Sequence, residues 1–224
     1  MLKQVKRKID KTEVLYAALR QDFSSFLEKV FYQITGSKEY HHNWHLDLFT
    51  KCVMDIMNGT ESRMIINVPP RSLKSICFSV AMPAFILGHN PNATFVCISH
   101  NQALADKHGL DFLTVVESTW FKELFPGMKI SKRSASKSDV QTTKGGRRMA
   151  IGLDGGILGH GGDFIIVDDP NSSDDLSSAS LETINDKFAR KILTRLNDQV
   201  TGRIIVVMQR LHENDLTGSL INEK

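Results

Sequence analysis

The stretch Met64–Ser75, MIINVPPRSLKS, decides how this chain of 224 residues folds. It begins with a short apolar run, which is typical of a strand buried in a parallel sheet. Pro69 and Pro70 then stop regular structure and force a loop whose backbone N–H groups can surround an anion. Lys74 and Ser75 open the next helix. The stretch therefore predicts a strand, a tight loop and a helix in succession.

The same loop is a candidate Walker A element for ATP. In such loops a lysine ammonium meets the β- and γ-phosphates, a hydroxyl binds Mg²⁺, and the helix N-terminus adds positive potential. Lys74 and Ser75 supply both groups, but Val68 and Leu73 stand where the pattern G-x-x-x-x-G-K-[ST] has glycine. These residues alone leave two interpretations open, a nucleotide site or a plain strand-turn-helix with a solvated lysine.

A second segment, Phe164–Pro170 (FIIVDDP), has the form of a Walker B element. Asp168 would hold Mg²⁺, and Asp169 would orient the attacking water, with a shorter reach than the usual glutamate. The plainer interpretation is an Asp-Asp-Pro turn that only ends a buried strand. Asp168 follows Lys74 by 94 residues, a separation that fits two elements of one nucleotide-binding sheet. Together the two segments favour ATP and Mg²⁺.

The rest of the chain alternates between strand and helix patterns. We expect strands at 64–68, 94–99, 164–167 and 204–208, a hairpin with strands at 139–143 and 148–152, and helices over 12–33, 73–87, 102–117 and 181–196. Pro83 should bend or end the second helix. The fold class is α/β, a mainly parallel sheet between helices with a P-loop NTPase core. Ligands of such sheets lie beyond the strand carboxyl ends, where Val68, Asp168 and Gln209 fall.

Four segments carry a resemblance to a known family. They are NWHL at 43–46, PPRSLKS at 69–75, the glycine-rich run 152–162 leading into IIVDDP, and VVMQRLHENDLTG at 206–218. In order and spacing they resemble the ATPase domain of a large terminase subunit, the DNA-packaging motor of tailed bacteriophages. The resemblance runs from about Tyr40 and implies a RecA- and helicase-like ATPase domain over 41–224. Apolar positions at near-helical spacing predict a helical lead-in over 1–40 before it. Complete large terminases also carry a nuclease domain, which we expect to be absent here, so no DNA cleavage is expected.

The resemblance also implies roles for site residues. The ATP phosphate-binding set is Pro70, Arg71, Ser72, Leu73, Lys74 and Ser75, the magnesium set is Ser75 and Asp168, and the catalytic set is Asp169, Gln209 and Arg71. Arg71 would contact the γ-phosphate, although a surface arginine is the plainer interpretation. Family members commonly have glycine at the position of Leu73 and often threonine at that of Gln209, whose amide can still hydrogen-bond phosphate or water. His212 and Asp215 would either join the chemistry or cap the following turn.

An aromatic and imidazole-rich segment, YHHNWHLDLF at 40–49, precedes the loop. In the family it lies near the adenine, so Tyr40, Trp44 and His45 are candidates for that side of the nucleotide. A tryptophan beside Leu46 and Phe49 is more often a core residue, and we predict that Trp44 is buried.

Net charge is a modest +3, but the segment 129–148 carries seven lysines and arginines against Asp139 alone. Three interpretations stay open: a sequence-independent contact to DNA phosphates, a solvated hairpin, or an arginine that reaches a neighbouring subunit's ATP. Lys144, Arg147 and Arg148 are the candidates.

Three widely spaced cysteines in apolar contexts indicate reduced, buried thiols, and we find no signal peptide or long apolar span. We expect a soluble protein of the bacterial host cytoplasm. The partners implied by the resemblance are double-stranded DNA, a portal protein, a small terminase subunit and sister subunits in a ring. Two other functions stay open, a catalytically silent DNA-binding or assembly module and a helicase-like translocase.

Overall fold

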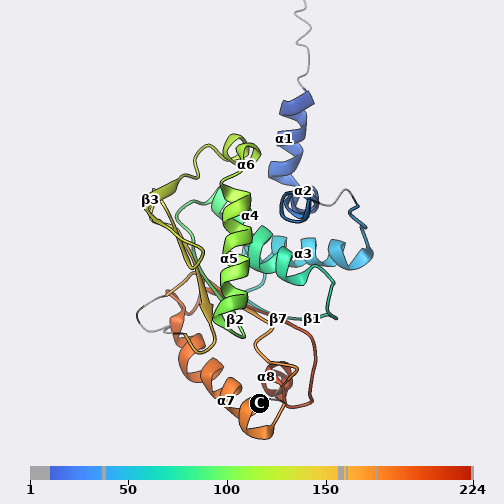
Figure 1. Ribbon diagram of the computed structural model, residues 1–224, viewed down its shortest axis with the longest axis vertical. Coiled ribbons are helices and arrows are strands. Elements are labelled where there is room, and N and C mark those ends of the chain that lie inside the picture. Colours follow the sequence, from blue (N-terminus) through green and yellow to red (C-terminus); the bar gives the residue numbers. More distant parts are fainter. Residues whose placement is uncertain (1–10, 37–38, 156–158, 160, 175, 223–224) are drawn as a thin grey trace, which may run out of the picture.

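A seven-stranded sheet with helices on both faces forms the body of the protein (Figure 1). The computed structural model describes residues 11–36, 39–155, 159, 161–174 and 176–222. The predicted lead-in over 1–10, Gly156 of the glycine run and the side chain of Arg133 lie outside the described part. None of the described helices has the length and apolar character needed to span a bilayer.

The strand order is β1-β7-β6-β2-β5-β4-β3, and the bounds agree closely with the expected strands. The strands are β1 (Arg63–Asn67), β2 (Thr94–Ser99), β3 (Ile130–Ala135), β4 (Asp139–Thr142), β5 (Arg147–Gly152), β6 (Phe164–Asp168) and β7 (Arg203–Met208). From β1 to β5 all neighbours are parallel, and β4 and β3 continue the sheet antiparallel. This confirms the predicted fold class and hairpin. The sequence reading missed β3, which adds a third strand to that hairpin.

The central strands are buried on both faces, as a parallel sheet between helices requires. Ile166, Ile205 and Val207 point into one core, whereas Ile165 and Val206 point into the other. The first core is covered by α2 (Phe23–Thr35), α3 (Trp44–Asn58), α4 (Met82–His89) and α5 (Gln102–Val116), with α1 (Lys11–Gln21) and α6 (Thr119–Leu124) at the upper end. The second core lies under α7 (Ser178–Lys187) and α8 (Leu216–Asn222).

The single helix expected over 12–33 is two helices. Asp22 is extended, with φ −109° and ψ 108°, and its carboxylate accepts hydrogen bonds from the N–H groups of Ser24 and Ser25. An N-cap aspartate therefore ends α1 and starts α2. Apolar spacing continued across the break, so the periodicity alone did not reveal it.

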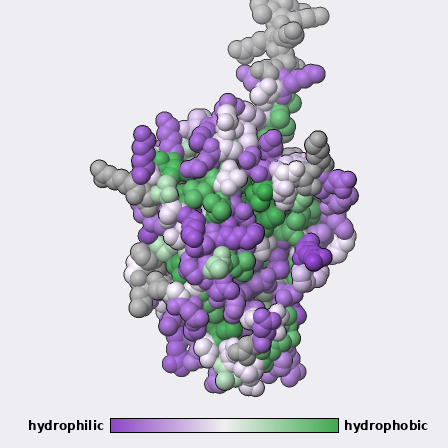
Figure 2. Space-filling model, viewed as in Figure 1, coloured by the Kyte–Doolittle hydropathy of each residue, from purple (hydrophilic) through white to green (hydrophobic). Residues whose placement is uncertain are grey.

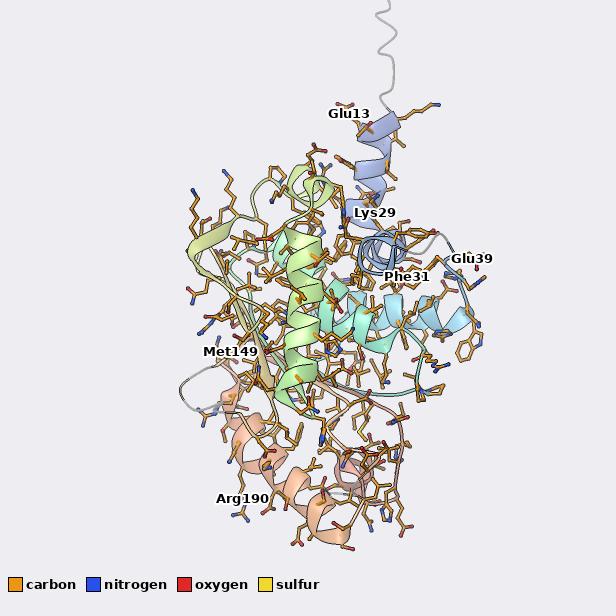
Figure 3. The ribbon with its side chains drawn as sticks, in the orientation of Figure 1. Glu13, Lys29, Phe31, Glu39, Met149 and Arg190 are labelled. Carbon is orange, nitrogen blue, oxygen red and sulfur yellow. The ribbon has the colours of Figure 1, made fainter. Side chains whose placement is uncertain are left out.

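The helices expected over 73–87 and 181–196 both contain a π-helical segment. The helix that opens at Lys74 runs through the π-helical segment Ile76–Ala81 into α4, so Pro83 neither ends it nor begins a loop. After α7 the chain continues as the π-helical segment Phe188–Ile192 and a short 3₁₀ turn, Leu193–Arg195, before β7. Arg190 points from this part away from the sheet (Figure 3).

Candidate functional site at the carboxyl edge of the sheet

The loops after β1, β7 and β6 leave the sheet next to one another, because these strands are parallel neighbours. The backbone N–H of Val68 donates to the carbonyl of Met208 at 3.1 Å, and the N–H of Asp169 donates to that of Val207 at 2.9 Å. The polar residues predicted at the three strand ends are thus brought to one edge. This edge is the candidate site.

The loop after β1 curls tightly without glycine. Arg71 has φ 64° and Leu73 has φ 63°, both in the left-handed region. That conformation costs a non-glycine residue about 1–2 kcal/mol, and it persists only where surrounding contacts impose it. Leu73 is partly buried against the first core, and its carbonyl accepts the N–H of Cys77 at 2.9 Å, which begins the helix. Leu73 therefore adopts the backbone conformation for which glycine is ordinarily selected.

The aromatic segment 40–49, which leads into α3, divides between three environments. Tyr40 is half-buried against the first core, and burial raises the pKa of its hydroxyl to about 12. Trp44 is 73% exposed at the start of α3, so the prediction that it is a core residue was wrong. Asn43 caps the helix, and its side-chain oxygen accepts the backbone N–H of Trp44 at 2.8 Å. His45 lies toward the loop, with its Nε2 3.2 Å from the carbonyl oxygen of Ser72.

Lys74 and Asp169 close the loop onto β6. The Lys74 Nζ lies 2.8 Å from an Asp169 carboxylate oxygen, and the lysine side chain is only 8% exposed. The other carboxylate oxygen of Asp169 accepts the backbone N–H of Gln209 at 3.1 Å. Asp169 also has a left-handed backbone, with φ 46°. This carboxylate thus joins the loop after β1 to the end of β7.

Asp168 is held by two serines of the helix that follows the loop. Ser75 Oγ donates to its Oδ1 at 3.1 Å, and Ser79 Oγ donates to its Oδ2 at 2.7 Å. Burial raises the pKa of Asp168 to about 6, against the hydrogen bonds from the serines, so the group is mostly ionised at pH 7. A carboxylate oxygen and a hydroxyl oxygen in direct contact are the donor types that Mg²⁺ takes. The predicted pair Ser75 and Asp168 therefore fits a magnesium ion.

Two further residues of this cluster, Ser79 and His108, did not emerge from the sequence. His108 Nδ1 lies 3.7 Å from Asp168 Oδ2 and 3.5 Å from the hydroxyl of Ser99. Burial lowers the pKa of His108 to about 3, helped by the charges of Arg148, Lys107 and Lys74, so the ring is neutral at pH 7. Ser79 follows Ser75 by four residues, a spacing that could have indicated it.

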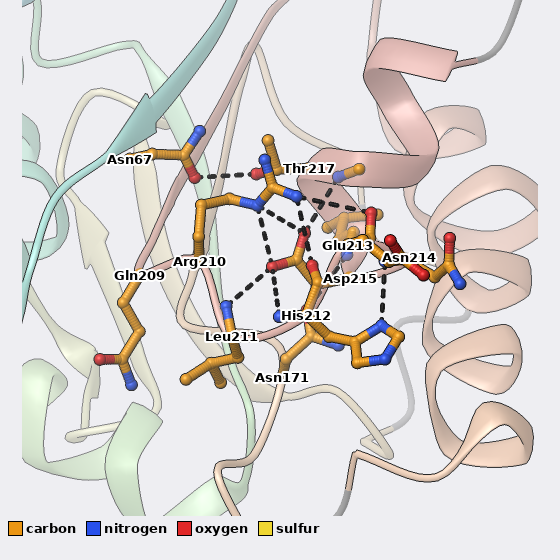
Figure 4. A network of polar contacts seen from close by, with 12 residues as sticks. Asn67, Asn171, Gln209, Arg210, Leu211, His212, Glu213, Asn214, Asp215 and Thr217 are labelled. Atoms are coloured by element: carbon orange, nitrogen blue, oxygen red, sulfur yellow. Dashed lines mark hydrogen bonds and ion pairs between the residues drawn. The ribbon is translucent and has the colours of Figure 1, made fainter.

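The loop after β7 is hydrogen-bonded mainly to itself (Figure 4). The carboxylate of Asp215, which is fully buried, accepts the N–H groups of Leu211, His212 and Gly218 and pairs with Arg210 Nε at 3.0 Å. Burial would raise the pKa of Asp215, but these donors hold it below its usual value. Asp215 therefore acts in turn capping, the second of the two alternatives. Gln209 lies outside this network.

The three basic candidates of the hairpin have different environments. Lys144 is exposed at the turn between β4 and β5. Arg147 makes a two-point pair with Asp139, from Nε at 2.6 Å and from Nη2 at 2.9 Å. Arg148 has no exposed surface. A guanidinium buried in this way cannot reach DNA or a neighbouring subunit, so both predictions are wrong for Arg148. Its side chain points into the core because alternate residues of β5 face opposite sides of the sheet.

Comparison with solved structures decides what this architecture resembles. A mutant of the large terminase ATPase domain of Thermus phage P74-26 matches with a TM-score of 0.52 and 16% identity, over 80% of this chain and 69% of that one. The fold is that of a large terminase ATPase domain. The large terminase of bacteriophage HK97 matches with a TM-score of 0.54 and 14% identity, over 96% of this chain.

The chain spans 41% of the HK97 protein, less than two thirds of its length. Neither protein-family models nor curated protein sequences give a match. At identities this low, the comparisons show the fold alone, the α/β fold of large terminase ATPase domains that the four sequence segments implied. The activity of the chain is a separate question, which depends on the site.

Proposed function

We propose that the chain is the ATP-hydrolysing motor domain of a viral large terminase, which drives double-stranded DNA into a procapsid. One observation carries the proposal: an ammonium, a hydroxyl and two carboxylates meet at one edge of the sheet, as Lys74 with Asp169 and Ser75 with Asp168. The terminase-like fold supports it. These four groups are what Mg²⁺-dependent phosphoryl transfer requires from a P-loop site.

Each group has a role in this proposal. Lys74, with the N-terminus of its helix and the loop from Pro70 to Ser72, binds the phosphates. Ser75 and Asp168 hold Mg²⁺, which when bound neutralises charge on the phosphate oxygens. Asp169 orients the attacking water, and Gln209, whose N–H already holds that carboxylate, links it to β7. Arg71, exposed on the loop, contacts the γ-phosphate.

We expect the phosphates of ATP to take the place of Asp169 as the partner of Lys74. Its ammonium pairs with Asp169 in this structure, at the distance of a direct ion pair. A phosphate that takes this ammonium releases the Asp169 carboxylate to accept hydrogen bonds from water. The nucleotide would thus place the lysine and the water-orienting group in their working positions in one step.

The adenine would lie beside the start of α3, where side chains are exposed. Trp44 presents an exposed indole, and His45 already touches the loop through Ser72. We propose that Trp44 stacks on the base and that His45 lies beside it. Tyr40 supports this end of α3 from the core, rather than by contact with the base.

The hairpin provides the proposed contact to DNA. Lys129, Lys132 and Lys144 are exposed, and Lys122, Lys129 and Lys132 line a cavity of about 590 Å³ below α6. Replacing Lys144 with alanine should weaken DNA binding equally for all sequences and reduce the slope of log K against log salt by about 1. Fluorescence anisotropy of labelled duplex DNA over a salt series measures both the affinity and this slope. We propose a portal ring, a small terminase subunit and sister subunits as further partners, in the cytoplasm of the bacterial host.

Steady-state ATP hydrolysis with Mg²⁺ and duplex DNA tests the function. Lys74→Ala should lose turnover by about 10²–10³-fold, because a preorganised charge at the transferred phosphate is removed. Lys107→Ala is the control, since Lys107 is an exposed lysine paired with Asp111 on α5. Equal background rates in wild type and Lys74→Ala would instead favour a silent DNA-binding or assembly module. The same reactions, run on a gel, should show no cut DNA.

A further inference from the structure

The carboxylate of Asp168 is only 1% exposed, and each of its oxygens has a serine partner. Ser75 takes Oδ1 and is the proposed magnesium ligand. Ser79 takes Oδ2 at 2.7 Å, and its side chain is 1% exposed, so it is too enclosed to meet a nucleotide directly. The second serine thus fixes the rotation of the carboxylate, and the first donates to its other oxygen.

The carbonyl of Ser79 lacks its ordinary helical partner. In an α-helix this oxygen would accept the N–H of residue 83, but that residue is proline and has none. The helix adapts with a π-helical segment over Ile76–Ala81, in which the N–H of Met82 reaches the carbonyl of Cys77. Such segments occur often at functional sites. The Ser79 carbonyl therefore has no α-helical donor at residue 83, and it can accept a hydrogen bond from elsewhere in the fold.

Arg148 of β5 supplies that donor. Its Nη2 lies 2.9 Å from the carbonyl oxygen of Ser79, and the whole side chain is buried. Its Nε and Nη1 have no oxygen or nitrogen partner among the described residues, and the guanidinium lies 5.2 Å from the centre of the Phe112 ring. Burial of an arginine with so few partners costs folding free energy, and the hydrogen bond to the Ser79 carbonyl offsets part of this cost.

The helix α5 closes over this arginine. Gly109 permits the approach, because a Cβ there would lie 1.6 Å from the carbonyl oxygen of Lys137 and 3.3 Å from Arg148 Nη1. Figure 1 shows α5 running along the sheet, and Figure 2 shows a mixed hydrophobic and hydrophilic surface over this face. Arg148 is thus an internal residue that serves its neighbours.

We propose that Ser79 and Arg148 are positioning residues for the magnesium-binding carboxylate of Asp168. Arg148 holds the π-helical turn through the Ser79 carbonyl, to which Pro83 cannot donate, and the Ser79 hydroxyl holds Asp168 Oδ2. The inference rests on the proposed function, because it assigns Mg²⁺ to Asp168. Residues that orient a metal ligand typically change metal affinity by about 10–100-fold when they are removed.

The test measures how much Mg²⁺ tightens nucleotide binding. Kd values for the β,γ-imido analogue of ATP are determined by calorimetry with Mg²⁺ and with EDTA, and their ratio is compared among variants. Ser79→Ala removes only the hydroxyl and should reduce this ratio about tenfold, with the Kd in EDTA nearly unchanged. Thr114→Val, which deletes an exposed hydroxyl of α5, is the matched control and should keep the wild-type ratio.

Arg148→Met keeps the length of the buried side chain and should reduce the ratio in the same direction. The double variant should be no worse than Ser79→Ala alone, because the arginine acts through the serine. If Arg148→Met does not fold, Ser79→Ala decides. A wild-type ratio in Ser79→Ala would overturn the positioning role alone. Absence of nucleotide binding, or of any Mg²⁺ effect, in the wild type would overturn the proposed function and this inference with it.

Discussion

Two neighbouring loops at the carboxyl edge of the sheet hold their polar groups in opposite ways. The loop after β1 has left-handed non-glycine residues, and its lysine pairs with a carboxylate of another strand. The loop after β7 satisfies its N–H groups from Asp215 within the same turn. Partners on another element can be exchanged for a ligand, whereas a self-capped turn stays closed. We infer that the loop after β1 changes its contacts when a ligand binds, whereas the loop after β7 keeps its own.

The largest effect on stability should come from the loop after β7. Asp215→Ala leaves several buried N–H groups and Arg210 without their acceptor, so we expect a loss of about 3–5 kcal/mol in the free energy of unfolding. Urea denaturation at pH 7 measures it. Lys74→Met in the other loop should cost about 1 kcal/mol or less, because Asp169 is 25% exposed and keeps the Gln209 N–H. Similar losses in both variants would remove the contrast.

The next effect concerns acid. The pKa of His108 is about 3 when folded and near 6.5 when unfolded, so its neutral burial favours the folded state above pH 6.5, and this contribution falls as the pH drops toward 3. The raised pKa of Asp168, about 6, acts oppositely, stabilising below pH 3.8 and losing its effect as the pH rises through 6. The two shifts therefore oppose each other between pH 4 and 6.

Replacing His108 with asparagine should uncouple these two effects. Between pH 7.5 and 4.5 the variant should gain stability relative to wild type, on the order of 2 kcal/mol, because only the wild type has to keep a neutral histidine. Urea denaturation at both pH values gives the difference, and any constant cost of the substitution cancels. If the free energy of unfolding changes equally with pH in the two proteins, His108 is protonated at pH 4.5 in the folded wild type.

The smallest effect tests the strain in the first loop. Arg71→Gly should raise the free energy of unfolding by about 1 kcal/mol, since glycine adopts φ 64° without a clash and the arginine side chain is exposed. Arg210→Gly in the second loop is the matched change and should lower stability, because it removes the pair with Asp215. Thermal unfolding of the two variants compares them. A loss of stability in Arg71→Gly would mean that the loop is not strained there.

Much of the fold followed from local pattern. The strands β1, β2, β6 and β7 and the hairpin lie where apolar runs and turn residues predicted them, because burial on both faces leaves a plain signature in the sequence. The meeting of Lys74, Ser75, Asp168 and Asp169 also followed, since parallel strands bring their carboxyl ends to one edge.

The errors share a physical cause. Trp44 and Arg148 were placed by residue type, the first inside and the second outside, and the structure reverses both. Trp44 lies in the first turn of α3 with its indole exposed, and the second arginine of β5 lies under α5. Burial depends on which face of an element meets a neighbour, and no local window contains that neighbour.

The sequence by itself determined where most strands and helices lie along the chain and which polar groups stand at the strand ends. Periodicity and turn residues act locally, so they can be recognised without the tertiary structure. The tertiary structure alone decided which oxygens of Asp168 meet Ser75 and Ser79, and that a buried arginine holds the turn between them. Those contacts join residues about 70 to 90 positions apart. They exist only once the sheet has formed and α5 has closed over it.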